Sequence, residues 1–182
     1  MRTKIFFLVI FSSLTIFARA QKTKEWVCIP CGNSCDLQTQ KGSGKCSACG
    51  MVLVDKSTIH FGNLSYMEFS QRIASNPEAL ILDVRSPAEF NGKTQDIPSF
   101  GHFKNAVNIN ITELEGRIGE IAAYKDKEVL VYCSHSHRSP QASYILGANG
   151  FKTVSNMTGG VSILAGKNND KLLQKTFVFH SH

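Results

Sequence analysis

The chain has 182 residues, of which 42% are hydrophobic and 19% are charged. This composition is that of an ordinary globular protein, and it excludes a disordered or fibrous chain. The length suits one domain, or one domain with a small module. The formal net charge is +6, from 20 basic and 14 acidic residues. Taken alone, that charge is compatible with a nucleic-acid or anionic-surface partner.

Residues 1–20 have the pattern of a secretory signal peptide. Two basic residues are followed by a mainly apolar run at 5–17, and Ala18-Arg19-Ala20 has the small-x-small pattern of a cleavage site. The run is shorter than the ~20 residues of a membrane span, so an uncleaved anchor is the less favoured alternative. Cleavage after Ala20 removes three basic residues and lowers the net charge to +3. We therefore expect a secreted or periplasmic protein with no stable membrane span after cleavage and no nucleic-acid partner.

The mature chain divides near residue 56. Residues 21–56 hold five of the six cysteines and few large apolar residues, which predicts a small cysteine-rich module. Residues 58–166 alternate short apolar runs with amphipathic segments, which predicts one α/β domain. Residues 167–182 are polar and then apolar, and no pattern assigns them to either part.

Two C-x-x-C-G units lie in the module, at 28–32 and 46–50, and 14 residues separate Cys31 from Cys46. A C-x-x-C pair spans one edge of a tetrahedral metal site, and the following glycine permits the turn that aims N–H groups at sulfur. About 35 residues cannot bury an adequate core, so this segment needs a cross-link. The spacing predicts a zinc-ribbon-like site with four cysteine ligands. The expected ligands are Cys28, Cys31, Cys46 and Cys49.

Disulfides are the alternative for these cysteines, because a secreted protein meets an oxidising compartment. Five cysteines cannot all pair within the module, and Cys35 is left over from the two units. It can be an alternative ligand, a free thiol or a relay partner of the sixth cysteine, Cys133. The segment is similar to heavy-metal-binding modules of bacterial extracytoplasmic proteins, which often end in C-G-M, as does Cys49-Gly50-Met51 here.

The elements of the α/β domain are expected in alternation. Continuous apolar runs, typical of a parallel sheet covered on both faces, predict strands at 80–84, 106–109, 129–132 and 153–154. Helices are expected to begin at Ser65, Ser86, Thr112 and Ser139. The first three have glutamate three residues later, which is the capping-box pattern. After Ser139, Pro140 suits a first helical position, and Gly150 is placed to end that helix.

Cys133 stands alone directly after the expected strand at 129–132. Ligands of open α/β sheets bind at this edge, and the N–H groups of a curled loop form an anion-binding concavity. The helix N-terminus beyond the loop favours thiolate over thiol. We predict that Cys133 is a reactive nucleophile, with a buried structural cysteine as the alternative. The predicted substrate-binding residues are Ser134, His135, Ser136, His137 and Arg138, with the two histidines as candidate proton carriers.

From about residue 58 to 166 the chain resembles a single-domain rhodanese, a sulfurtransferase with a five-stranded parallel sheet. The motifs that carry the resemblance are Asp83-Val84-Arg85 with Glu89-Phe90, Gly101–Ile109, Cys133–Arg138 and Val154–Gly160. The resemblance implies that Cys133 attacks a sulfane donor such as thiosulfate, becomes a persulfide and passes the sulfur to a thiol or another nucleophile, without a cofactor. It also implies that the loop amides stabilise the anionic sulfur and that Arg138 holds the loop or the donor. Asp83, Arg85, Glu89 and His102 look structural.

Four residues depart from the family pattern. Ser136 and Asn105 each replace a usual glycine, and His135 and His137 are also atypical. Related phosphatases on this fold have five residues between cysteine and arginine, whereas four separate Cys133 from Arg138 here. The shorter loop suits a sulfur atom better than a phosphate. The alternatives to a sulfurtransferase are a non-catalytic metal- or sulfur-binding protein and, less favoured, a phosphatase or arsenate-reductase-like enzyme.

Overall fold

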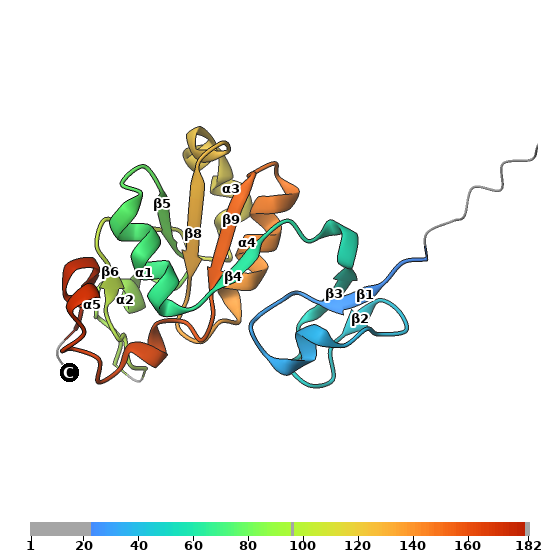
Figure 1. Ribbon diagram of the computed structural model, residues 1–182, viewed down its shortest axis with the longest axis horizontal. Coiled ribbons are helices and arrows are strands. Elements are labelled where there is room, and N and C mark those ends of the chain that lie inside the picture. Colours follow the sequence, from blue (N-terminus) through green and yellow to red (C-terminus); the bar gives the residue numbers. More distant parts are fainter. Residues whose placement is uncertain (1–22, 96, 181–182) are drawn as a thin grey trace, which may run out of the picture.

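The computed structural model describes residues 23–95 and 97–180, so the signal peptide expected at 1–20 lies outside the described residues. The chain forms a larger α/β domain and a small module beside it (Figure 1). The helices are α1 (Tyr66–Ser75), α2 (Pro87–Phe90), α3 (Leu114–Arg117), α4 (Arg138–Ala148) and α5 (Lys171–Thr176). Short 3-10 helices are η1 (Ser34–Leu37), η2 (Lys56–Thr58), η3 (Ile118–Tyr124) and η4 (Val161–Leu164).

A five-stranded sheet forms the centre of the α/β domain, and every strand pair in it is parallel. Its strands, in spatial order, are β4 (Gly62–Leu64), β9 (Thr153–Met157), β8 (Glu128–Tyr132), β5 (Leu80–Asp83) and β7 (Val107–Asn108). This confirms the expected fold class. The edge strand β4 was not expected, because its residues are largely exposed and only Leu64 is apolar.

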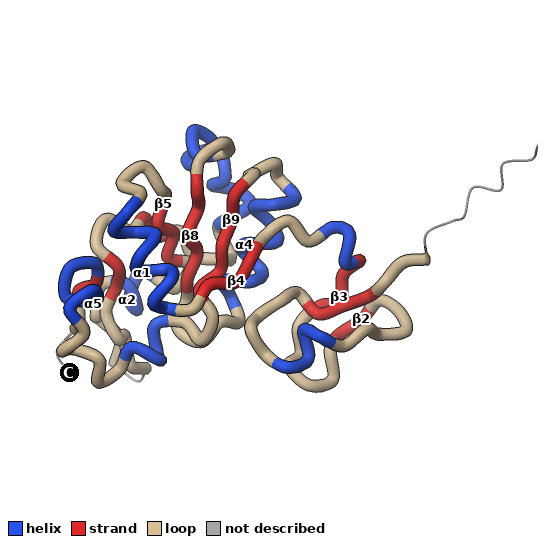
Figure 2. The backbone as a smooth tube through the Cα atoms, viewed as in Figure 1, coloured by secondary structure: helices blue, strands red, loops and turns tan. Residues whose placement is uncertain are grey.

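Alternating side chains of the central strands feed two hydrophobic layers, as the period of a strand requires. On one face, Val129 and Val131 pack with Leu146 of α4 and with residues of α3 and η3. On the other, Leu130 and Tyr132 pack with residues of α1, α5 and η4. The tube drawing shows helices on both sides of the sheet (Figure 2). The runs that looked continuously apolar are therefore buried on both faces.

Two of the four predicted helix starts are confirmed as complete capping boxes, at Ser65 with Glu68 and at Ser86 with Glu89. The other two predictions are wrong. Helix α3 is preceded by Glu113 rather than Thr112, and no side chain caps it. Helix α4 begins at Arg138, before Ser139, and the Ser139 hydroxyl donates to the Cys133 sulfur within the helix.

The module is a three-stranded antiparallel sheet in the order β1 (Trp26–Cys28), β3 (Val52–Asp55) and β2 (Gly44–Lys45). The module packs on the α/β domain through a separate apolar cluster, in which Ile29 and Met51 contact Tyr144 of α4. The Tyr144 hydroxyl also lies 3.0 Å from Thr58 Oγ1. The module is thus packed on the larger domain.

The segment that the sequence left unassigned, from residue 167 on, completes the α/β domain. Helix α5 is followed by β10 (Phe177–Val178), which pairs antiparallel with β6 (His102–Phe103). Gly101 lies so close to this strand that a Cβ atom there would be 2.0 Å from the carbonyl oxygen of Val178. Only glycine fits that position.

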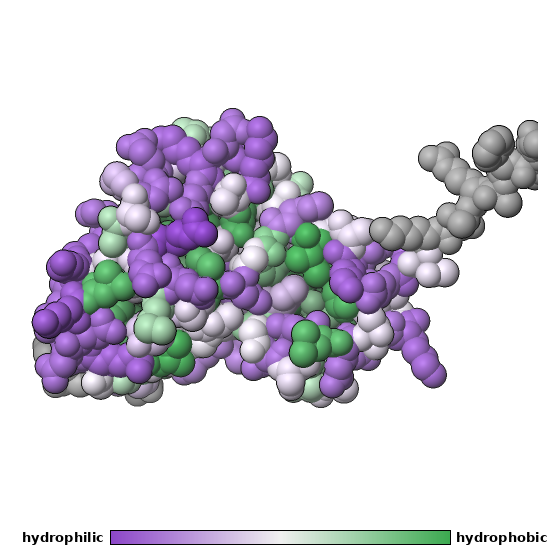
Figure 3. All heavy atoms as spheres, in the orientation of Figure 1, coloured by the Kyte–Doolittle hydropathy of each residue, from purple (hydrophilic) through white to green (hydrophobic). Residues whose placement is uncertain are grey.

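No helix in the described part of the chain combines the length and the apolar character that crossing a membrane requires. The face shown in Figure 3 is mainly hydrophilic, and its hydrophobic residues form small separate groups.

Candidate functional site

Cys133 lies immediately beyond the carboxyl end of β8, where its side chain joins the apolar layer under α4. It is 1% exposed. Its sulfur accepts a hydrogen bond from the hydroxyl of Ser139, which is itself fully buried, at 3.3 Å. The eleven-residue helix α4 begins five residues after Cys133, so the positive end of its dipole lies near this loop. Hydroxyl and dipole both favour an anionic sulfur, and the sequence reasoning missed the Ser139 contact.

The four residues between Cys133 and Arg138 alternate in burial. Ser134 and Ser136 are buried, whereas His135 and His137 are exposed. Within the described residues, the backbone N–H groups of 134–137 donate to no protein acceptor. A row of free amides on a curled loop binds anions, so the loop is suited to hold an anionic sulfur. The histidines face outward, and the His135 ring packs edge-on against Phe100 with centroids 5.8 Å apart.

Arg138 is held by a carboxylate that the sequence assigned only to structure. Its guanidinium donates to both carboxylate oxygens of Glu89, at 2.7 and 2.6 Å, and to the Ser134 hydroxyl at 2.8 Å. Burial raises the pKa of Glu89, but the hydrogen bonds from Arg138 and from the Ser86 backbone outweigh it and lower the pKa to about 2. The pair is therefore ionised at neutral pH. Of the two roles implied for Arg138, the geometry favours holding the loop.

The Gly159-Gly160 turn closes the loop from the other side. The Val161 N–H donates to the Cys133 carbonyl, and the Ser162 N–H donates to the Ser134 carbonyl, both at 2.9 Å. A Cβ atom on Gly160 would lie 2.4 Å from the Ser134 carbonyl group, so no side chain fits there. The two glycines of the fourth motif thus permit this close approach.

Ser136 has a backbone φ of 55°, in the left-handed region, as does Asn105 at 61°. These are the two positions where the family usually has glycine, and the conformation supplies the reason. A residue other than glycine costs about 1–2 kcal/mol in this region. The Ser136 hydroxyl donates to the carbonyl oxygen of Cys31 at 2.9 Å and accepts from Asn156 Nδ2 at 3.2 Å. One of these partners belongs to the cysteine module.

A buried ion pair lies at the same edge of the sheet. Arg85 Nη2 is 2.6 Å from Asp83 Oδ2, and both side chains are fully buried. Arg85 also donates to the carbonyl oxygens of Ser99 and Gly101, both at 2.7 Å. These bonds join the end of β5 to the Ser99–Gly101 segment, so the pair has a structural role at this edge of the sheet.

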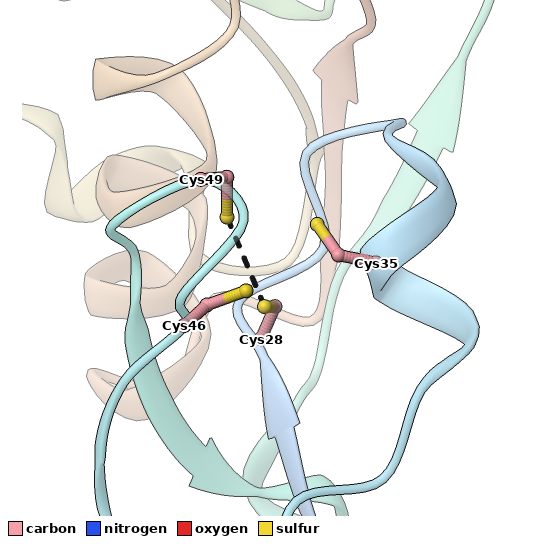
Figure 4. A group of neighbouring side chains, drawn as sticks. All are labelled: Cys28, Cys35, Cys46 and Cys49. Carbon is pink, nitrogen blue, oxygen red and sulfur yellow. Dashed lines mark hydrogen bonds between the residues drawn. The ribbon is translucent and has the colours of Figure 1, made fainter.

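Four sulfur atoms gather in the module. They belong to Cys28, Cys35, Cys46 and Cys49 and lie within 4.8 Å of one another, pointing toward a common centre (Figure 4). The sulfurs of Cys28 and Cys49 are 3.8 Å apart. A tetrahedral metal with M–S bonds near ~2.3 Å requires S···S edges of ~3.8 Å. This group of cysteines can therefore bind a metal.

Cys31 is not part of this cluster, and Cys35 takes the place that the C-x-x-C spacing assigned to it. The Asp36 carboxylate accepts from the backbone N–H groups of Cys31 and Gly32, at 2.9 and 2.7 Å. Asn33 Nδ2 donates to the Cys31 sulfur at 3.1 Å. These local bonds turn Cys31 toward Asp36, and η1 carries Cys35 to the sulfur cluster.

The second C-x-x-C unit has the predicted geometry. The thiol of Cys28 and the backbone N–H groups of Cys49 and Ala48 interact with the Cys46 sulfur and lower its pKa to about 6. Gly50 follows with a φ of 73°, as a tight turn around a metal ligand requires. Burial, by contrast, raises the pKa of Cys28 and Cys35.

Comparison with known proteins agrees with the resemblance found in the sequence. Residues 65–165 match the family described as a rhodanese-like domain. The chain is 38% identical over 90 residues to the uncharacterized protein YqhL of Bacillus subtilis, covering 50% of this chain and 64% of that protein. It is 30% identical over 134 residues to a tRNA uridine(34) hydroxylase of Escherichia coli, covering 66% of this chain and 36% of the enzyme.

The chain therefore spans less than two thirds of the length of either relative. Among solved structures, it resembles that of reduced Bacillus anthracis CoADR-RHD with a TM-score of 0.50 at 23% identity. That match covers 66% of this chain and 18% of the other, and it is a likeness of fold alone.

Proposed function

Because the chain belongs to the rhodanese-like domain family, we propose that it is a sulfurtransferase that carries sulfane sulfur as a persulfide on Cys133. The observation that carries this proposal is the loop geometry. The Cys133 sulfur accepts from Ser139, and the amides of 134–137 have no protein acceptor in the described residues, so they are available to an anionic sulfur bound to Cys133. Arg138 and Glu89 hold the loop around it.

The reaction needs two displacements at sulfur. The Cys133 thiolate attacks the outer sulfur of a thiosulfate-like donor, the S–S bond of the donor breaks, and sulfite leaves with the electron pair. The loop amides stabilise the negative charge of the persulfide. An acceptor thiolate then attacks the outer sulfur, the Cys133 S–S bond breaks, and the Cys133 thiolate returns. His135 and His137 are the exposed side chains of this loop and are our candidate contacts for such an acceptor.

We further propose that Cys28, Cys35, Cys46 and Cys49 bind zinc. An all-thiolate tetrahedral set is typical of structural zinc, which would cross-link a module with only a small apolar cluster. The metal takes no part in sulfur transfer. The N-terminal pattern supports a secreted or periplasmic location for the mature protein, and the small mature charge is the reason to expect no nucleic-acid partner.

Mass spectrometry tests the enzymatic proposal directly. After incubation of the purified protein with thiosulfate, we expect a gain of about 32 Da on the Cys133 peptide and its loss on addition of a thiol or cyanide. The Cys133→Ser variant should show neither change and should keep its metal content. If the wild-type protein acquires no persulfide, the chain is a binding protein and not a sulfurtransferase.

Native intact mass, measured on protein from its own compartment, tests the other parts. A chain that begins at Gln21 would support export, and zinc retained under native conditions would support the metal site. Disulfides in place of retained metal would exclude the zinc proposal.

A further inference from the structure

The turn at Cys31 and Gly32 belongs to the module but contacts the α/β domain at two points. The Cys31 carbonyl accepts from the Ser136 hydroxyl at 2.9 Å, in a buried contact. A Cβ atom on Gly32 would lie 2.7 Å from Thr158 Cγ2, so the turn packs directly on Thr158. Gly32 has a φ of 93°. The Cys31 sulfur lies within 4.8 Å of the Cys35 sulfur, so this turn joins the edge of the sulfur cluster to the larger domain.

Both contacts fall on the two segments that frame Cys133. Ser136 is the third residue of the Cys133 loop. Thr158 directly precedes the Gly159-Gly160 turn, whose following N–H group donates to the Cys133 carbonyl. A displacement of the turn at Cys31 would therefore shift both segments that flank Cys133.

Ser136 is also the loop residue whose conformation is least favourable without outside contacts. It adopts the left-handed conformation without being glycine. Its buried hydroxyl donates to Cys31 and accepts from Asn156, so it is fully bonded only while the module is in place. If the module moved, a buried donor would lose its acceptor.

We propose that the Cys31–Gly32 turn is a positioning element of the Cys133 loop and that Ser136 is the positioning residue through which it acts. The module is then part of the sulfur-transfer site as well as a metal-binding unit. This inference rests on the proposed sulfurtransferase function. Sulfur transfer requires the loop amides at a fixed position, and a small displacement of such groups lowers a rate strongly.

Gly32→Ala tests the proposal, because the added methyl group must displace the turn from Thr158. Gly44→Ala is the matched control, since Gly44 also lies in the module with a positive φ of 142° and a Cβ there would meet no atom within 4 Å. We expect Gly32→Ala to lower kcat for transfer from thiosulfate about tenfold, with a smaller change in KM. Gly44→Ala should retain the wild-type kcat.

The rate at which iodoacetamide alkylates Cys133, followed by peptide mass spectrometry across a range of pH, is the second readout. We expect Gly32→Ala to change this profile while zinc content stays at the wild-type level. An unchanged kcat and an unchanged profile in Gly32→Ala would overturn the proposal. If the wild-type protein transfers no sulfur, the proposed function fails, but the alkylation profile still tests the positioning role.

Ser136→Gly identifies the route, because glycine accepts the φ but has no hydroxyl. In this background, Gly32→Ala should lower the alkylation rate less than it does in the wild-type protein. Equal effects in the two backgrounds would exclude Ser136 as the connection and overturn its assignment.

Discussion

In the module, four cysteines surround one centre above a small apolar cluster, whereas Cys133 follows a strand buried between two full hydrophobic layers. The module has so little core that its sulfur atoms, once bound to a metal, would hold the fold together. In the α/β domain, Cys133 is one member of a large buried layer, and its sulfur is held by that packing and by Ser139. The number of cysteines is thus a poor guide to their role, and the surrounding packing is a better one.

Metal removal gives the largest expected difference between the two regions. Structural zinc contributes about 10–16 kcal/mol in small Cys-rich peptides, so chelation under reducing conditions should unfold the module. Hydrogen exchange should then rise in β1 and β3 while β8 remains protected. Protection of β1 and β3 in metal-free protein would contradict the proposal that the metal holds the module.

The next largest effect concerns the buried ion pair of the α/β domain. Asp83→Ala leaves Arg85 charged and buried, which should lower the free energy of unfolding by about 3–5 kcal/mol in urea titrations. Lys152→Ala is the control, because the pair of Lys152 with Asp126 is largely exposed and should contribute less than about 1 kcal/mol. Similar losses in both variants would show that the Asp83–Arg85 pair does not organise this edge of the sheet.

Acid should weaken the support of the Cys133 loop. The folded pKa of Glu89 is about 2, below the usual value of 4.5, so the unfolded chain binds the proton first as pH falls. The Glu89–Arg138 pair therefore stabilises the folded state fully above about pH 4.5 and loses this effect between about pH 4.5 and 2. The full contribution is about 3 kcal/mol.

Urea unfolding of the wild-type protein and of Glu89→Gln, at pH 6 and at pH 3, measures this effect. The difference between the two proteins should shrink by about 2 kcal/mol at the lower pH. Because the module titrates equally in both proteins, only this difference is diagnostic. A difference independent of pH would mean that the carboxylate does not hold Arg138.

The smallest effect belongs to the hydroxyl that contacts the nucleophile. Ser139→Ala removes the hydrogen bond to the Cys133 sulfur, worth about 1 kcal/mol, and should slow alkylation and sulfur transfer about fivefold. Ser143→Ala is the matched control, because Ser143 is buried in the same helix and its hydroxyl has no hydrogen-bond partner in the described structure. Equal rates in the two variants would show that Ser139 does not stabilise the thiolate.

Much of the fold could be predicted because its signals are local. The apolar runs at 80–83 and 129–132 are long enough to identify buried strands, and the Ser65 and Ser86 capping boxes form within four residues. The parallel sheet, and the place of Cys133 at its edge, follow from those elements. Strand β4 was missed because an exposed edge strand of three residues has no hydrophobic pattern.

The details of the two sites depend on contacts that spacing does not encode. Cys31 matches the C-x-x-C pattern, but the Asp36 carboxylate competes for its backbone and Cys35 fills the cluster instead. The Glu89–Arg138 pair spans 49 residues, and neither the Ser86 capping box nor the family motif that contains Glu89 identified Arg138 as its partner. The sequence predicted a helix start at Ser139, because a serine hydroxyl can cap a helix. The sequence does not show that this hydroxyl donates to the Cys133 sulfur instead.

The pairing of β10 with β6 has a consequence for synthesis. Gly101 packs under the carbonyl oxygen of Val178, and the Gly101 carbonyl in turn accepts from Arg85. Strand β9 must also be made before β4 has a partner in the sheet. The α/β domain therefore cannot complete these pairings until residues up to Val178 have been synthesised. All residues of the module are therefore synthesised well before the larger domain can complete its pairing.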